Sequence, residues 1–244
     1  MGATKIEFRL RMATMFAILT LGFTAPWIQH GPRIPLIEWL PLEFSRHGHV
    51  SFAVATPIVI VLAALIAAKA MVFRVWGAAY LGPATVIHGH MRGDSLVASG
   101  PYRYLRNPLY IGLWAMTYAL SFLMPPTGAL FVAIVVPLFL LRLTLGEEAF
   151  LTGELGQPYV DYLRAVPRLV PRLRTSLPSS AGKPQWLRAV LSEFTSIGVF
   201  LALAVFSWSY DLLLMVKVIL VCFGISLVAR ALLPAAGKEA DPAE

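Results

Sequence analysis

Long apolar runs alternate along the whole chain with polar segments that are punctuated by proline and glycine. Several of the runs exceed about 18 residues with few charges, the length that an α-helix needs to cross the hydrocarbon core of a bilayer. Because a helix satisfies its backbone hydrogen bonds internally, the pattern predicts an all-α integral membrane protein. About six transmembrane helices are predicted, over residues 12–28, 50–73, 108–124, 127–145, 186–208 and 212–233.

Short turns join the later helices into pairs and leave two large polar segments between them. Pro125-Pro126 closes one hairpin, and a three-residue turn that begins at Ser209 closes the last. The polar segments are therefore expected to face each other across the mouth of the first hairpin. The predicted regions are an N-terminal two-helix membrane region (1–82), a core of loop, hairpin and cytoplasmic cap (83–175) and a C-terminal hairpin with its tail (176–244).

Composition agrees with a membrane protein and excludes other classes. Hydrophobic residues make up 58% of the chain and charged residues only 14%, with a mean hydropathy of +0.72. The net charge is +7, but the basic residues lie in loops that flank the helices, so membrane lipids and no nucleic acid are expected as partners. The single cysteine, Cys222, lies in an apolar run and excludes an intramolecular disulfide and a thiolate metal cluster.

The distribution of basic residues predicts the orientation of the protein in the membrane. Of the 20 Lys and Arg residues, 17 fall on one side of the predicted bilayer, Arg33 and Arg46 fall on the other, and Lys217 lies within a span. Basic loops remain on the cytoplasmic side. A multi-pass protein with cytoplasmic N- and C-termini is therefore predicted, and both large polar segments are cytoplasmic as well.

The first polar segment ends in a basic, tyrosine-rich stretch, SLVASGPYRYLRNPLYIG, from Ser95 to Gly112. Pro108 stands where the next helix begins, a position that needs no backbone N–H. Three tyrosines and two arginines at a membrane boundary are typical of an anchor for a transmembrane helix. They are also suited to binding a charged ligand. The segment that begins at Glu147 helps to decide between a membrane anchor and a ligand-binding site.

Glu147 and Glu148 stand side by side at the cytoplasmic end of the fourth predicted helix. Paired carboxylates beside an apolar helix are unfavourable unless something binds them. Either both are solvated where the helix leaves the membrane, or one of them binds the ammonium group of a cationic ligand. Beyond them, Gly156 and Pro158 interrupt a segment with helical periodicity, so the chain is expected to fold back over the membrane surface as a cap.

The sequence gives little support for other kinds of catalytic or metal site. His88 and His90 do not have the spacing of a zinc site, so no metal is expected, and His88 as a general base has little support. The motifs of serine hydrolases, phosphate-binding loops and dinucleotide-binding folds are absent from the sequence. Lys217 is a charge inside a span, where it is either functional or relieved by snorkelling along its stem.

GPYRYLRNPLYIG and, after one helical hairpin, EEAFLTGELGQPYVDYLRAVPRLVP together resemble the isoprenylcysteine carboxyl methyltransferase family, to which phospholipid N-methyltransferases are related. The resemblance extends over residues 94–171, and the two motifs occur in the family's order and spacing. It implies that the core, 83–175, is a methyltransferase with S-adenosyl-L-methionine (SAM) as its cofactor. It also implies a lipophilic small-molecule or lipid substrate that arrives from the bilayer.

The resemblance implies particular site residues as well. The implied catalytic positions are Arg106 and Arg142, and Arg142 adjoins Leu143, which aligns with the family's substrate-binding arginine. Asn107 stands where the family usually has histidine, so a titratable group is lost. The leucine at 143 departs from the enzymes that act on a prenylcysteine carboxylate. The implied cofactor-binding residues are Asp94, Ser95, Leu96, Val97, Tyr102, Asn107, Pro108, Leu109, Tyr110, Glu147 and Glu148.

The chemistry of SAM agrees with these residue types. Its ammonium group needs a carboxylate, its carboxylate needs polar or basic groups, and its sulfonium and adenine suit tyrosine faces. Methyl transfer is a displacement at carbon, for which the protein aligns the reactants and excludes water. A carboxylate acceptor needs no general base, whereas an amine needs one. A bulky residue at Gly112, near the mouth of the hairpin, is expected to hinder lateral access of the acceptor.

Two other functions remain open from the sequence. Membrane-embedded, NADPH-dependent sterol reductases carry a similar arginine- and tyrosine-rich loop. Their cofactor needs several basic contacts to a 2′-phosphate, however, and the glutamate pair favours an ammonium-bearing ligand. The third hypothesis is a non-enzymatic channel or membrane assembly factor. It does not explain the paired glutamates or the tyrosine-rich stretch.

Overall fold

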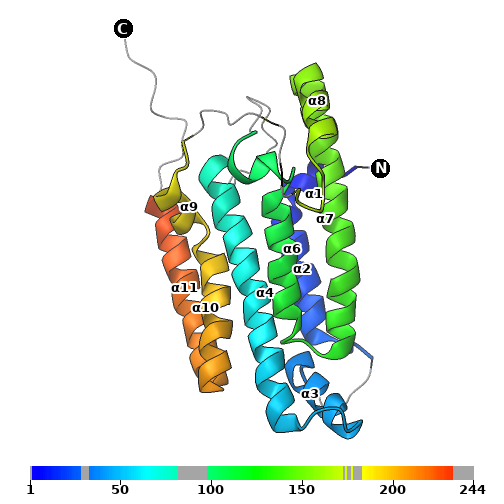
Figure 1. The fold of residues 1–244 in the computed structure, drawn as a ribbon, viewed down its shortest axis with the longest axis vertical. Helices are drawn as coiled ribbons and strands as arrows, with labels where there is room; N and C mark the ends of the chain where they lie inside the picture. Colours follow the sequence, from blue (N-terminus) through cyan, green and yellow to red (C-terminus); the bar gives the residue numbers. More distant parts are fainter. Residues whose placement is uncertain are drawn as a thin grey trace.

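A computed structural model describes residues 2–28, 33–81, 98–172, 174, 177 and 183–232. Within these residues the regular elements are all helices, as predicted, and the longer ones lie side by side in a bundle (Figure 1). The elements are α1 (Lys5–Arg9), α2 (Arg11–Thr24), α3 (Leu36–Arg46), α4 (Phe52–Leu81), the 3₁₀-helix η1 (Gly100–Arg103), α6 (Pro108–Ser121), α7 (Pro126–Leu155), α8 (Gln157–Ala165), α9 (Trp186–Ser192), α10 (Phe194–Ser209) and α11 (Leu212–Leu232).

Three helices in the described part of the chain are long and apolar enough to cross a membrane: α4, α7 and the Leu212–Ala229 part of α11. The pair α9–α10, bent by 67°, is a fourth span if it crosses as one unit. The protein is therefore a multi-pass membrane protein. Helices α2 and α6 have 14 residues each, or about 21 Å, which is short of a hydrocarbon core of ~30 Å. Both lie beside α7 in the bundle (Figure 1), and the count of six spans stays a prediction.

Small residues allow the helices to approach one another closely. Ala63, Ala67 and Ala78 of α4 are almost completely buried. Gly128 of α7 lies so close to α2 that a Cβ atom there would stand 1.9 Å from the carbonyl oxygen of Gly22. Because lipid provides no hydrophobic drive for helices to associate, close van der Waals packing of this kind holds membrane helices together.

Two helices continue past the points at which their apolar runs end. Helix α4 runs beyond the predicted end at Phe73 to Leu81, and α7 runs beyond Leu145 to Leu155. Arg74 and Glu148 in these extensions are compatible with a buried helix because other parts of the fold supply ion-pair partners for them. The end of an apolar run therefore marks a change of surroundings and not the end of the helix.

Two further segments differ from the sequence-based prediction. The predicted loop 29–49 contains α3, whose first backbone N–H groups, at Leu36 and Ile37, donate to carbonyl groups after α6 at 2.7 and 2.8 Å. These bonds satisfy groups that a helix start leaves unpaired, so the helix forms in spite of Pro41. The predicted single span 186–208 is broken at Glu193, where the carboxylate is drawn to an arginine of α4.

Helix α7 ends at Gly156, whose φ of 62° lies in the left-handed region that glycine adopts readily. Helix α8 then turns back along the end of α7, so the predicted break and reversal are confirmed. Its role as a cytoplasmic cap stays a prediction. The reversal is held by apolar contacts between side chains of the two helices and the residue after α8: Leu151, Leu155, Tyr159, Tyr162 and Val166.

Candidate active site

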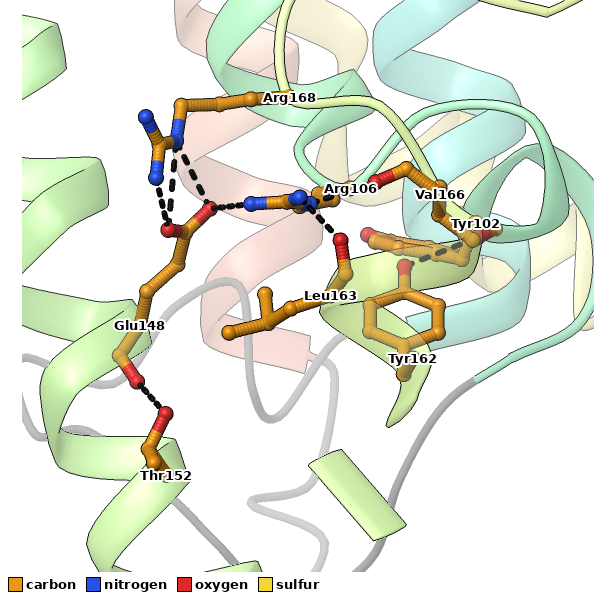
Figure 2. A network of polar contacts seen from close by, with 8 residues as sticks. All are labelled: Tyr102, Arg106, Glu148, Thr152, Tyr162, Leu163, Val166 and Arg168. Atoms are coloured by element: carbon orange, nitrogen blue, oxygen red, sulfur yellow. Dashed lines mark hydrogen bonds and ion pairs between the residues drawn. The ribbon is translucent and has the colours of Figure 1, made fainter. Parts of the chain in front are cut away.

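A buried carboxylate between two arginines forms the centre of the candidate site (Figure 2). Glu148 of α7 is only 6% exposed. Its Oε1 accepts a hydrogen bond of 3.0 Å from Arg106, and its Oε2 accepts one of 2.6 Å from Nη2 of Arg168. Nε of Arg168 adds contacts of 3.1 and 3.2 Å. Bidentate, charge-assisted hydrogen bonds fix the orientation of both partners. Both carboxylate oxygens of Glu148 are therefore hydrogen-bonded within the protein.

Arg106 also binds the end of α8 and the residues that follow it. Its Nε donates to the carbonyl oxygen of Val166 at 2.6 Å, and its Nη2 donates to that of Leu163. Its backbone N–H donates to the carbonyl oxygen of Pro167 at 3.0 Å. The tyrosine-rich stretch and the segment after the glutamate pair are thereby joined, which confirms that the two predicted segments meet.

Tyr102 lies next to this network, in η1, and is 7% exposed. Its carbonyl oxygen accepts a hydrogen bond of 2.8 Å from the hydroxyl of Tyr162 (Figure 2). Burial raises the pKa of Tyr102 and of Tyr162 well above the ordinary value, so both hydroxyls keep their protons at neutral pH. Among the described residues the Tyr102 hydroxyl has no hydrogen-bond partner. A buried, unpaired donor is unfavourable, so this hydroxyl is a candidate donor to a ligand.

Replacing Tyr162 with phenylalanine is expected to lower the free energy of unfolding by about 1 kcal/mol, because a buried carbonyl group loses its donor while the ring still packs. Denaturant titration of the purified protein in detergent micelles measures the loss. Tyr118→Phe is the matched control, since Tyr118 of α6 is 45% exposed. Equal stability of the two variants would contradict the prediction.

Glu147 points in a different direction from its neighbour, because successive helical residues differ by about 100°. It is half-buried, and its carboxylate interacts with the hydroxyl of Tyr110 and the guanidinium of Arg11. Tyr102 is also within its electrostatic reach. The glutamate pair is therefore divided: Glu148 holds the arginine network, and Glu147 faces the tyrosines.

A groove with a volume of about 180 Å³ opens between α6 and α7 beside Tyr110, and we refer to it as the α6–α7 groove. The side-chain nitrogen of Asn107, which lines it, is buried without a partner among the described residues. Trp114 and Leu138 line the groove and are also exposed, so the groove opens on the outer face of the bundle. The polar lining residues are Asn107, Tyr110, Thr144 and Arg168; the apolar ones include Ile111, Trp114, Leu138, Leu141 and Leu169.

Comparison with known proteins connects this geometry to a family. Residues 58–157 match the family described as phospholipid methyltransferase. Over 167 residues the chain is 30% identical to the cobalt-zinc-cadmium resistance protein CzcN of Cupriavidus metallidurans. The aligned region covers 64% of this chain and 69% of that protein. The chain belongs to the phospholipid methyltransferase family. The family group predicted from the sequence is thereby confirmed. No solved structure matches the chain.

The part of the chain that matches the phospholipid methyltransferase family contains Tyr102, Arg106 and both glutamates. Arg168 and helices α9–α11 lie outside it. The metals in the name of the relative describe that protein. Within the described residues of this family member, no group of three His, Cys, Asp or Glu side chains is arranged to hold a metal ion.

Some residues predicted for the methyltransferase site lie away from the network. Arg142 pairs with Glu7 of α1 at 2.9 Å, and its side chain is 45% exposed. Pro108 begins α6 as predicted, but the side chain of Leu109 packs on Gly77 of α4 and not on the arginine network. The following predicted residues lie outside the described part of the chain: His88, His90, Asp94, Ser95, Leu96 and Val97.

Gly112 also lies away from the α6–α7 groove. It faces α4, where a Cβ atom would stand 2.5 Å from Cγ of Arg74. The expectation that a bulky residue at Gly112 hinders the acceptor is therefore wrong. Such a residue would separate α6 from α4, because the nearest atoms belong to a buried helix contact.

The sequence alone did not identify Arg168 as a site residue. It was counted only among the basic residues that predict the orientation in the membrane. In the structure it binds Glu148, and hydrogen bonding to that carboxylate raises the pKa of the guanidinium. A signal was present, because Arg168 stands between Pro167 and Pro171 in a segment expected to fold back toward the glutamates. Prolines restrict the backbone around it and reduce the entropy lost when the ion pair forms.

Proposed function

We propose that this protein is a SAM-dependent methyltransferase that methylates a lipophilic acceptor at the cytoplasmic surface of the membrane. The division of the glutamate pair carries the proposal. Glu148 is engaged by two arginines, whereas Glu147 faces Tyr102 and Tyr110 beside the α6–α7 groove. A half-buried carboxylate next to tyrosines suits a ligand that bears both an ammonium and a sulfonium group.

The residues around Glu147 fit the cofactor. Its carboxylate is suited to the ammonium group of SAM, and Tyr110 is placed to orient it. The Tyr102 hydroxyl and the Asn107 amide are buried donors without partners among the described residues, and they suit oxygen atoms of the ligand. When bound, SAM supplies a methyl group on a positively charged sulfur. The protein aligns the acceptor with that methyl group and excludes water.

The α6–α7 groove fits an acceptor with an apolar body. Ile111 and Leu141 provide apolar walls, and Asn107 and Arg168 line the same groove; Arg168 is bound to Glu148, the neighbour of Glu147 in the chain. Because the apolar end is open toward lipid, an acceptor dissolved in the bilayer reaches the groove sideways. The acceptor is either a carboxylate of an isoprenoid or prenyl compound or the amine of a lipid.

Filling the groove is expected to separate acceptor binding from cofactor binding. Leu141→Trp should lower methyl transfer to a lipid roughly 10- to 100-fold by displacing the acceptor, while the affinity for S-adenosylhomocysteine stays unchanged. Labelled methyl transfer in lipid nanodiscs and calorimetry measure the two effects. Leu130→Trp is the control, since Leu130 is 62% exposed on the same helix and does not line the groove. Equal losses in both variants would contradict lateral access.

The orientation of the chain follows from its charges, and we infer six spans with both termini in the cytoplasm. The inference rests on the distribution of Lys and Arg, of which 17 lie on one side of the predicted bilayer and 2 on the other. Alkaline phosphatase fused after Leu155 or at the C-terminus is expected to be inactive, and green fluorescent protein at the same positions is expected to fluoresce. An active phosphatase after Leu155 would place the glutamates on the wrong side for a cytoplasmic cofactor.

Ligand binding tests the proposed function directly. Purified protein in nanodiscs is titrated by calorimetry with SAM and, separately, with NADPH, and only SAM is expected to bind. Labelled SAM with lipid extracts that contain prenyl acids and amine lipids then identifies the product by mass. Binding of NADPH alone would favour a reductase, and binding of neither ligand would contradict an enzyme that uses SAM.

A further inference from the structure

A buried ion pair joins the C-terminal helices to α4. Nε and Nη2 of Arg74 donate to the two carboxylate oxygens of Glu193, each at 2.6 Å. Glu193 is 2% exposed and also accepts a hydrogen bond of 3.0 Å from the hydroxyl of Ser196. It stands between α9 and α10, where the helix axis bends by 67°. Because a buried carboxylate without its partner is strongly unfavourable, the bend and the ion pair depend on each other.

A second set of contacts joins α9 to the end of α4. The backbone N–H of Gln185 donates to the carbonyl oxygen of Ala79 at 2.8 Å. The ring of Trp186 meets that of Tyr80 edge to face, with 6.4 Å between centroids. Tyr80 in turn lies against Gly100, where φ is 53° and a Cβ atom would stand 2.4 Å from the Tyr80 ring. Gly100 is the first residue of η1, so α9 supports this helix through Tyr80.

Both sets of contacts lead to the candidate site. Nη1 of Arg74 donates to the carbonyl oxygen of Leu109 at 3.4 Å, in the first turn of α6 and directly before Tyr110. Tyr80 supports the helix that carries Tyr102. The two tyrosines that face Glu147 are therefore backed by one end of α4, and α9 and Glu193 hold that end in place.

We propose that the C-terminal hairpin positions the cofactor site and that Glu193 is a positioning residue. Glu193 fixes the start of α6 through Arg74, and α9 fixes η1 through Tyr80. The inference rests on the proposed function for the identity of the ligand, whereas the ordering of residues 98–112 is a property of the free protein. A hairpin that served only as a membrane anchor would require neither of these contacts.

Two variants separate the effect on positioning from the effect on stability. Glu193→Gln leaves Arg74 buried without its counter-ion and is expected to affect both. The double variant Arg74→Met, Glu193→Met removes both charges, and replacing a buried ion pair by apolar residues is often neutral for stability. Ser226→Ala is the control, because Ser226 accepts a hydrogen bond of 2.9 Å from Thr195 between α10 and α11 and has no part in the contacts with α4.

Hydrogen exchange with mass spectrometry, on the full-length protein without ligand, measures the ordering. Peptides from 98–112 are expected to exchange roughly tenfold faster or more in the double variant and at the wild-type rate in Ser226→Ala. The dissociation constant of S-adenosylhomocysteine, measured by calorimetry, should rise roughly tenfold or more in the double variant. Glu193→Asp, which keeps the charge, should recover part of what Glu193→Gln loses.

The outcomes distinguish this inference from the proposed function. Wild-type protein that binds no S-adenosylhomocysteine contradicts the proposed function, while the exchange rates still decide the inference. Wild-type exchange over 98–112 in a double variant that melts at the wild-type temperature overturns the inference. If the double variant does not fold, the comparison of Glu193→Gln with Glu193→Asp decides it, and equal exchange over 98–112 overturns it.

Discussion

Replacing Glu148 with glutamine is expected to lower the free energy of unfolding by about 3 kcal/mol, because it breaks a buried ion pair from the carboxylate side. The carboxylate accepts hydrogen bonds from Arg106 and Arg168. Glutamine removes the charge and presents N–H groups to guanidinium groups that can only donate. The side chain of Arg168 is 35% exposed, so water relieves part of the loss and the expected value lies at the lower end for broken buried pairs.

Denaturant titration in detergent micelles measures the change. Arg142→Gln is the matched control, because Arg142 lies on the same helix and its ion pair with Glu7 is exposed to solvent. Exposed pairs contribute little to stability, so this variant is expected to unfold close to the wild-type midpoint. If Glu148→Gln unfolds there as well, the arginine network does not hold the end of α8 against α7.

Glu147→Gln is expected to leave the stability nearly unchanged and to weaken the binding of SAM by about 1–3 kcal/mol, or roughly 5- to 150-fold. The structure shows Glu147 outside the network of Arg106 and Arg168, beside Tyr110 and Arg11. Glutamine keeps a side-chain oxygen that can accept a hydrogen bond from the Tyr110 hydroxyl, so the electrostatic contact with Arg11 is the main internal loss. A charge-assisted hydrogen bond to the ammonium group of the ligand would become a neutral one, which is roughly half as strong.

Calorimetric titration with SAM measures the affinity, and thermal unfolding without ligand measures the stability. Glu154→Gln is the control, since Glu154 lies exposed near the end of the same helix and carries the same charge. An unchanged dissociation constant in Glu147→Gln, with Glu148→Gln also binding normally, would remove both carboxylates from the cofactor site. The pair of variants also tests whether the two neighbouring glutamates have different roles.

Local features of the sequence predict much of the architecture. Apolar runs longer than a bilayer core identify the long helices, Pro108 identifies the start of α6, and Gly156 identifies the end of α7. These features act within one helical turn or one span, so they can be recognised without knowing the rest of the fold. The continuation of α4 past Phe73 to Leu81 and of α7 past Leu145 is not local in this sense, because tertiary ion-pair partners allow the charged extensions.

The residue types of the site were also apparent in the sequence: tyrosines and arginines before the hairpin, and paired carboxylates after it. The roles of individual residues were not. Glu148 pairs with Arg106 and Arg168, which lie 42 and 20 residues away in the sequence. Arg74 pairs with Glu193, which lies 119 residues away. The local sequence does not show which arginine pairs with which carboxylate, because the partners come from segments that are distant along the chain.

By itself the sequence determined that this protein is helical, that it lies in a membrane, and that two motifs of one methyltransferase family stand in their usual order. The tertiary structure decided that Glu148, and not Glu147, is bound by Arg106 and Arg168, and that the C-terminal hairpin contacts the end of α4 behind the candidate site. The physical reason is that hydropathy and backbone preferences act along the chain, whereas the pairing of buried charges depends on which helices pack together. Adjacent glutamates differ by about 100° around the helix, and only the packing of α6 and α8 against α7 assigns a partner to each direction.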